Sequence, residues 1–176
     1  MDIQPLDFED VKLITPQVFY DARGFFLETF HKTRYAFLGE ETFPQDNLSY
    51  SKYGTLRGMH FQTVPGQAKF VQVVKGKIFD VFVDIRKGSP TFGKWQGVYL
   101  DDEKRQQLFL PVGFAHGFCC MSEEAYVLYK VSSEYRSETE RGFRYDDPQV
   151  GIQWPLEAPI LSDRDLKAPF LEGALV

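Results

Sequence analysis

The sequence contains little cysteine, little histidine and no long apolar run. Two of its 176 residues are cysteines and three are histidines. Cys119 and Cys120 are adjacent, and neighbouring cysteines rarely reach disulfide geometry without straining the peptide between them. This usage favours a reducing, cytoplasmic location. No window approaches the roughly 18 apolar residues that a membrane-spanning helix needs, and the acidic start of the chain is unlike a secretion signal.

Positive charge is also in the minority, with 20 Lys and Arg against 25 Asp and Glu, a formal net charge of −5. This balance argues against a nucleic-acid or membrane-surface partner, so an anionic ligand would need locally placed cations. The chain has no repeat, low-complexity tract or Ser/Gly linker. We therefore expect residues 1–176 to form one domain.

The chain is rich in apolar residues, at 43%, and contains 17 Phe and 9 Tyr, which excludes a disordered protein. Its periodicity is mainly that of strands. Residues 78–86 alternate between a face of Phe79, Val81, Val83 and Ile85 and a face of Asp80, Phe82, Asp84 and Arg86.

Turn signals separate the strand-like segments. Gly76 lies between two apolar runs and predicts a hairpin, and residues 86–95 predict a longer turn. Residues 30–40 are the best candidate for a short helix, with Phe30, Phe37 and Leu38 on one side and Gly39 as its end. The proline-interrupted tail from residue 155 should wrap over a sheet. Together these features predict an all-β, cupin-type jelly-roll sandwich or barrel with a few short helices.

Two histidines occur in spacings that resemble the two cupin motifs. Gly54 precedes His60 with five residues between them, and Pro111, Gly113 and His116 follow the pattern P-x-G-x-x-H. Metal-binding cupins have a second histidine and an acid after the first histidine, where this chain has Gln62 and, near the acid's position, Lys69. Because a lysine ammonium would repel a divalent cation, we predict no metal. A metal-dependent cupin oxygenase is thereby disfavoured.

Seven blocks, spread in order over nearly the whole chain, carry a family resemblance. They are DARGFFLETF (21–30), FPQDNLSYSKYGTLRGMHFQ (43–62), VFVDIRKGSPTFGKW (81–95), VGFAHGF (112–118), LYK (128–130), DDPQVGIQWPL (146–156) and LSDRD (161–165). The chain resembles the dTDP-4-dehydrorhamnose 3,5-epimerase family. The resemblance implies a metal-free jelly roll, a homodimer with exchanged N-terminal strands, and cofactor-free epimerisation beside the ketone of a dTDP-4-keto-6-deoxyhexose.

The resemblance also implies catalytic roles. His60 matches the base, Asp165 the carboxylate that orients it, Tyr129 the acid, and Lys69 the cation near the ketone oxygen. A hydrogen beside a ketone is weakly acidic, and its removal requires a base of near-neutral pKa and stabilisation of the enolate. Each residue also has a structural interpretation: His60 as an ordinary strand residue, Tyr129 as a packing aromatic and Lys69 as a surface charge.

The remaining matches concern substrate binding. Arg23 and Arg57 match positions that contact the diphosphate, although Arg23 could instead pair with Glu28 or Asp21. The positions that match the nucleoside, nucleotide or pocket contacts of relatives are Glu28, Gln45, Asn47, His116, Tyr135 and Glu140. His116 could equally be a buried structural histidine, and His31 is expected to be ordinary surface.

Three positions differ from the usual pattern of the family: Gln72, Val112 and Glu134. They could indicate a divergent nucleotide sugar. The family also contains members that invert only C3, so the resemblance leaves inversion at C3 alone or C5 alone open. The other class to consider is a sugar-nucleotide-binding cupin without catalysis. The latter has no need of His60, Tyr129 and Asp165 together.

Overall fold

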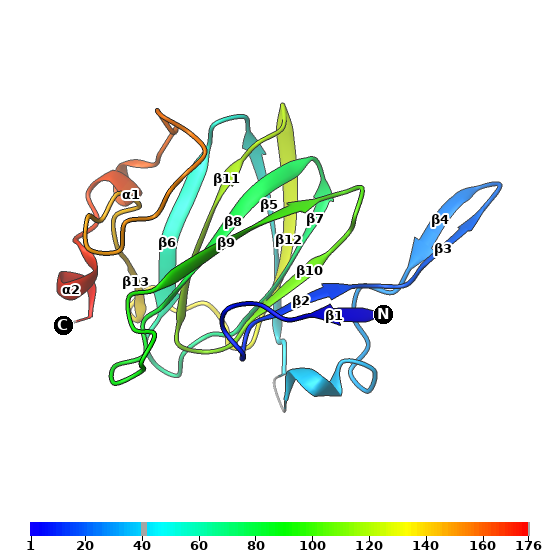
Figure 1. Cartoon of the computed structure of the whole chain (residues 1–176), viewed down its shortest axis with the longest axis horizontal. Coiled ribbons are helices and arrows are strands. Elements are labelled where there is room, and N and C mark those ends of the chain that lie inside the picture. The colour runs from blue at the N-terminus through cyan, green and yellow to red at the C-terminus, as the bar shows by residue number, and fades with distance from the viewer. Residues whose placement is uncertain (40–41, 176) are drawn as a thin grey trace.

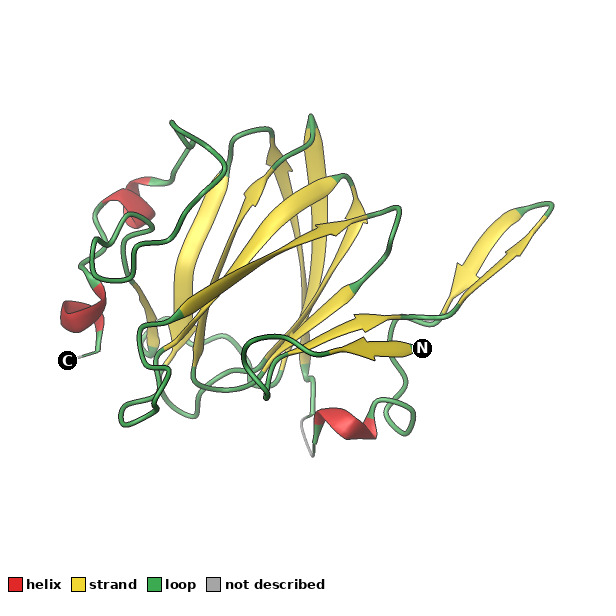
Figure 2. Ribbon diagram, in the orientation of Figure 1, coloured by secondary structure: helices red, strands yellow, loops and turns green. Residues whose placement is uncertain are grey.

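Two antiparallel sheets face each other in the computed structural model, which describes residues 1–39 and 42–175 (Figures 1 and 2). The first sheet has the order β1 (Asp2–Gln4), β2 (Lys12–Thr15), β10 (Gln107–Leu110), β7 (Lys69–Lys75), β12 (Glu124–Val131) and β5 (Gln45–Lys52). The second has the order β13 (Glu140–Gly142), β6 (Leu56–Gln62), β11 (Phe114–Cys120), β8 (Lys77–Asp84) and β9 (Trp95–Asp101). The all-β prediction is confirmed.

The main hydrophobic core fills the space between the sheets. Phe82 of β8 and Phe114 of β11 pack edge-on, with ring centroids 6.2 Å apart, and Phe8 lies against both rings. The other face of β8 is also covered, because Val81 and Val83 belong to a second cluster formed with the C-terminal segment. The alternation expected for residues 78–86 is therefore confirmed, with both faces buried.

The connection at Gly76 differs from the expected hairpin. The strands on either side of it, β7 and β8, lie in different sheets, so the chain crosses from one layer to the other within one residue. Gly76 has a φ of 85°, and a Cβ there would come within 2.1 Å of the Glu124 carbonyl oxygen. A hairpin and a crossing between sheets need the same residues in the tight turn. Pairing with distant strands decides which sheet each strand joins, so the local sequence does not distinguish the two.

The helix expected over residues 30–40 is reduced to a turn and the 3₁₀ helix η1 (Ala36–Leu38), followed by Gly39. Residues 40 and 41 lie outside the described residues. Tyr35 explains the short element: its hydroxyl donates to Gln107 Oε1 (2.9 Å), and its ring packs against Phe30 and Phe70. Tertiary packing of aromatic residues thus replaces a regular helix.

The C-terminal tail wraps over the second sheet, as expected. The backbone N–H of Leu56 donates to the carbonyl oxygen of Ile160 (2.9 Å), which ties the tail to the start of β6. Two short helices follow, α1 (Asp163–Leu166) and α2 (Leu171–Ala174). Ser162 caps α1 by accepting a hydrogen bond from the backbone N–H of Asp165 (3.1 Å). The cap fixes Asp165 beside β6.

A separate hairpin, β3 (Val18–Asp21) and β4 (Gly24–Leu27), extends away from the two sheets (Figure 1). It carries four exposed aromatic side chains: Phe19, Tyr20, Phe25 and Phe26. Arg105 stacks on the Phe25 ring at 4.1 Å and holds the hairpin against the turn before β10. Within the described residues, no helix is both long and apolar enough to cross a membrane.

Candidate active site

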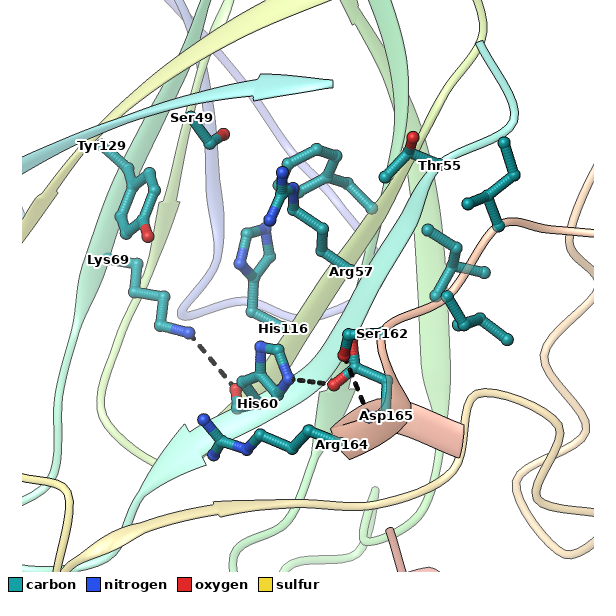
Figure 3. A pocket seen from close by; sticks show the side chains of 14 residues that line it. Ser49, Thr55, Arg57, His60, Lys69, His116, Tyr129, Ser162, Arg164 and Asp165 are labelled. Carbon is teal, nitrogen blue, oxygen red and sulfur yellow. Dashed lines mark hydrogen bonds and ion pairs between the residues drawn. The ribbon is translucent and has the colours of Figure 1, made fainter. Parts of the chain in front are cut away.

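A cavity of about 450 Å³ opens between the sheets at the end covered by the C-terminal tail. Its polar wall comes from both sheets and from the tail, as the close view in Figure 3 shows. Six of the residues singled out from the sequence line it: Arg57, His60, Lys69, His116, Tyr129 and Asp165.

Arg57 and His60 share the cavity because β6 is irregular. In a regular strand, residues three apart point to opposite faces. Here the pairing with β11 shifts register, since Phe118 faces Arg57 while His116 faces His60. Gly58, with a φ of 118°, lies in this bulge, and a Cβ there would come within 2.6 Å of the Gly117 Cα. Such bulges re-aim side chains beside active sites, which is the purpose that this one serves.

His60 and Asp165 form a close pair, with 2.6 Å between Nε2 and Oδ1 although 105 residues separate them in the chain. Burial raises the pKa of Asp165. The hydrogen bonds with His60 and with the Ser162 side chain lower it, and together with the charge of His60 they outweigh burial, so the pKa lies below its usual value. Asp165 is therefore a carboxylate that accepts a hydrogen bond from Nε2–H of His60. His60 Nδ1 is left with the lone pair that a base requires.

Lys69 is buried, at 7% exposure, and its ammonium donates to the carbonyl oxygen of His60 (3.2 Å). Among the described residues it has no carboxylate within ion-pair distance. Burial lowers its pKa to about 8, with Glu140 and Asp80 opposing the shift through their charges. A mostly protonated ammonium thus faces the cavity without a direct counter-ion, ready for a developing negative charge.

His116 lies beside His60 on the neighbouring strand β11, and its Nε2 contacts both carboxylate oxygens of Asp80, at 3.0 and 2.9 Å. Both residues are buried, and burial lowers the pKa of His116 while Asp80 opposes this. His116 is thus a buried residue paired with Asp80 that also lines the cavity. Nothing in the sequence indicates that Asp80 contacts His116. The alternation of residues 78–86 shows only which face of the strand Asp80 occupies, and His116 lies 36 residues away.

Tyr129 enters the cavity from the first sheet, opposite the strand that carries His60. Burial raises the pKa of its phenol above the usual value, against the opposing effect of Arg57. Arg57 is held by β5: its Nε donates to Ser51 Oγ (3.0 Å) and its Nη2 to the Tyr50 carbonyl oxygen (2.9 Å). A protonated phenol and a fixed guanidinium therefore face the same space.

Four further candidates lie near the cavity but do not line it. Gln45 Nε2 donates to Asn47 Oδ1 (2.9 Å), and Gln45 Oε1 accepts from the backbone N–H of Tyr135 (2.8 Å). Glu140, whose carboxylate raises the pKa of Tyr135, pairs with Arg164 at 2.7 Å. Arg164 lines the cavity and was not singled out from the sequence, although its place before Asp165 in LSDRD was a usable signal.

Arg23 and Glu28 lie outside the cavity of their own chain. Arg23 is next to the tip of the exposed hairpin, with 90% of its side chain exposed, and pairs with Asp21. Glu28 pairs with Arg34 instead. Within one chain, Arg23 therefore forms the ion pair with Asp21 that was the alternative to a diphosphate contact.

The positions that differ from the family pattern do not line the cavity either. Gln72 accepts a hydrogen bond from Gln107 (3.0 Å), and Val112 and Glu134 are exposed. Gln62, which stands where metal-binding cupins have their second histidine, donates a hydrogen bond to Ser133 Oγ (3.0 Å). In residues 1–39 and 42–175 there is no group of three His, Cys, Asp or Glu side chains able to hold a metal ion.

Comparison with known proteins gives a consistent result. Residues 5–173 match the family dTDP-4-dehydrorhamnose 3,5-epimerase. A relative of that name from Neisseria gonorrhoeae is 51% identical over 94% of this chain, which spans 51% of the relative's length. A dTDP-4-dehydrorhamnose 3-epimerase from Streptomyces niveus is 46% identical over 99% of this chain and 86% of its own.

The fold agrees with a solved structure of an epimerase. The crystal structure of dTDP-6-deoxy-D-glucose-3,5-epimerase from Legionella pneumophila, in complex with dTDP-4-keto-L-rhamnose, superimposes with a TM-score of 0.95. It is 45% identical and covers 97% of this chain and 93% of its own.

Proposed function

The chain belongs to the dTDP-4-dehydrorhamnose 3,5-epimerase family, and we propose that it carries out this epimerisation with His60, Lys69 and Tyr129 as the groups that handle protons and charge. It is an isomerase. Its reaction is inversion at C3 and C5 of a dTDP-4-keto-6-deoxyhexose, which converts dTDP-4-dehydro-6-deoxyglucose to dTDP-4-dehydro-L-rhamnose. The single observation that supports the residue roles best is the His60–Asp165 pair at 2.6 Å on the cavity wall.

His60 Nδ1 removes the proton from the carbon beside the ketone. Asp165 holds the ring by accepting a hydrogen bond from Nε2–H, and its negative charge stabilises the imidazolium that forms. Removal of this proton converts the substrate to an enolate, whose negative oxygen needs a fixed positive group nearby. Lys69, buried and free of a direct carboxylate partner among the described residues, supplies that charge.

Tyr129 delivers the new proton to the other face of the enolate. Inversion requires the acid and the base to approach the sugar from different sides. Tyr129 stands on β12 of the first sheet and His60 on β6 of the second, so they enter from opposite walls (Figure 3). The raised pKa of Tyr129 keeps the phenol protonated at neutral pH. These proton transfers need no redox cofactor.

The charge on Lys69 should set the alkaline side of the pH profile. Because burial lowers its pKa to about 8, the ammonium is lost as the pH rises through that value. We expect kcat/KM to fall above about pH 8, approaching roughly tenfold per pH unit. Deprotonation of Tyr129 would act only at higher pH, since its pKa is raised from 10.0.

The measurement is kcat/KM from pH 6 to 10, with circular dichroism at each pH to confirm folding. Lys69→Met should be slower at every pH and should lack the decline near pH 8. A wild-type profile that stays flat to pH 10 would contradict the proposed role of Lys69.

The diphosphate is bound by Arg57 and, across a subunit boundary, by Arg23. In support, the β3–β4 hairpin extends from its own chain with four exposed aromatic side chains and an exposed Arg23. A homodimer that exchanges this segment would cover the aromatic residues and bring Arg23 and Glu28 to the partner's cavity. The nucleoside is then received by four residues that lie beside the cavity: Glu140, Tyr135, Gln45 and Asn47.

Inversion at C3 alone is the second candidate, favoured by the 46% identity to the 3-epimerase of S. niveus. The two reactions use the same base and differ in how many carbons exchange protons. Incubation with dTDP-4-keto-6-deoxyglucose in D2O, followed by mass spectrometry and NMR of the sugar, separates them. We expect deuterium at both C3 and C5. Deuterium at C3 alone would establish the 3-epimerase, and no exchange would contradict both.

A further inference from the structure

Ser49, on the wall of the cavity, has a buried hydroxyl without a hydrogen-bond partner among the described residues. Its Oγ is one of two buried side-chain oxygen or nitrogen atoms that have no hydrogen-bond partner within the described residues, the other being Thr139 Oγ1. Ser49 lines the cavity, and Figure 3 shows its side chain near Tyr129. Thr139 is not among the residues of the cavity wall.

An unpaired buried hydroxyl is unfavourable for the free protein. Leaving such a group without a partner costs about 1–3 kcal/mol, and nearly all buried polar groups in proteins are paired for this reason. A hydroxyl of this kind on a cavity wall indicates that its partner arrives with the ligand.

The strand that carries Ser49 has an inverted pattern of polarity. Along β5 the side chains facing the sheet interior are polar, and those facing outward include Leu48 and Tyr50, which are 63% and 44% exposed. A strand that only closed a hydrophobic core would show the opposite alternation. The inward residues are Gln45, Asn47, Ser49 and Ser51. The inner face of β5 is therefore built to contact a polar ligand.

Position along β5 indicates which part of the ligand Ser49 meets. Ser51, one inward position further along, accepts a hydrogen bond from Arg57 Nε, while the Tyr50 carbonyl oxygen accepts one from Nη2. Arg57 Nη1 makes no hydrogen bond with the described residues. Ser49 is the next inward side chain along β5 from Ser51, and it lines the same cavity as Arg57.

We propose that the Ser49 hydroxyl donates a hydrogen bond to a non-bridging oxygen of the substrate's diphosphate, next to Arg57. This inference rests on the proposed function, since it assumes a nucleoside diphosphate sugar in this cavity. The hydroxyl gains a charged acceptor on binding, and hydrogen bonds to charged groups are the stronger class. Ser49 is thus a substrate-contacting residue that the sequence motifs did not single out.

The test is Ser49→Ala, probed with dTDP by calorimetry and by thermal unfolding. We expect dTDP affinity to fall about tenfold or more. The free variant should unfold at the same or a higher temperature than wild type, because the unpaired hydroxyl is gone. A residue with only a structural role would give the opposite result: a lower unfolding temperature and unchanged dTDP affinity. That result would overturn the proposal.

Thr139→Val is the matched control, because it removes the other hydroxyl without a partner in the described residues, and Thr139 does not line the cavity. It should leave dTDP affinity unchanged, and an equal loss there would also overturn the assignment. A loss of kcat/KM in Ser49→Ala without a loss of dTDP affinity would place the contact on the sugar instead and contradict the diphosphate assignment.

Wild type and Arg57→Ala separate this inference from the proposed function. If wild type binds dTDP and Arg57→Ala weakens it while Ser49→Ala does not, only the Ser49 inference is wrong. If wild type does not bind dTDP, the proposed function itself is wrong.

Discussion

His60→Ala should lower kcat by roughly 10²- to 10⁴-fold, the range expected when a positioned general base is removed. The physical reason is that His60 Nδ1 carries the lone pair that removes the proton. The hydrogen bond between His60 Nε2 and Asp165, at 2.6 Å, holds the ring in place. Rate should be followed by NMR of the sugar nucleotide, together with wash-in of deuterium at C3 and C5. Both exchanges should disappear together, because one base serves both carbons.

The loss in His60→Ala should be a loss of chemistry rather than of binding. Arg57 and Tyr129 stay in place, so dTDP affinity should change little. Asp165→Asn, which keeps the ring nearby but removes the charge that stabilises the imidazolium, should be slow in the same step. Near-full activity in His60→Ala, or deuterium exchange lost at one carbon only, would contradict His60 as the single base.

A mixture of two impaired variants, Arg23→Ala and His60→Ala, should recover activity. If the hairpin of one subunit completes the cavity of the other, a mixed dimer contains one cavity with both native residues and one with neither. Random exchange of subunits makes half of the dimers mixed, so about a quarter of wild-type activity is expected at subsaturating substrate. Each variant alone should show far less, because every cavity then lacks one of the two groups.

The recovery must depend on subunit exchange. The two variants should therefore be unfolded and refolded together, and compared with samples refolded separately and mixed just before the assay. Activity should appear only in the first sample. No recovery in refolded samples that are shown to be dimeric would mean that Arg23 does not act in the partner's cavity, and the exchanged-hairpin proposal would be wrong.

Several features of the fold and site were accessible from the sequence. The two-residue alternation of residues 78–86 predicted a strand with an apolar face and a face of mixed polarity, because backbone geometry alone sets that period. The ordered motif blocks identified the family. The blocks contain five of the predicted site residues that line the cavity, Arg57, His60, His116, Tyr129 and Asp165, and the family resemblance added Lys69.

Other features required the folded chain. The turn at Gly76 has the same local signature whether it joins paired strands or crosses between sheets, and the structure shows the crossing. The segment 30–39 has helical spacing, yet its aromatic residues pack on Phe70 and leave only a short 3₁₀ helix. Local propensity is weak compared with such packing.

The sequence by itself determined the strand periodicity, the family and the chemical types of the reacting groups, all of which depend on neighbouring residues or on matched motifs. Tertiary structure decided which of those groups meet. The bulge at Gly58 turned Arg57 and His60 toward one cavity, and the tail brought Asp165 across 105 residues. The Ser49 hydroxyl, which has no partner within residues 1–39 and 42–175, can be recognised only when its neighbours in the fold are in place. Such contacts depend on long-range pairing between strands and loops, and local sequence does not encode that pairing.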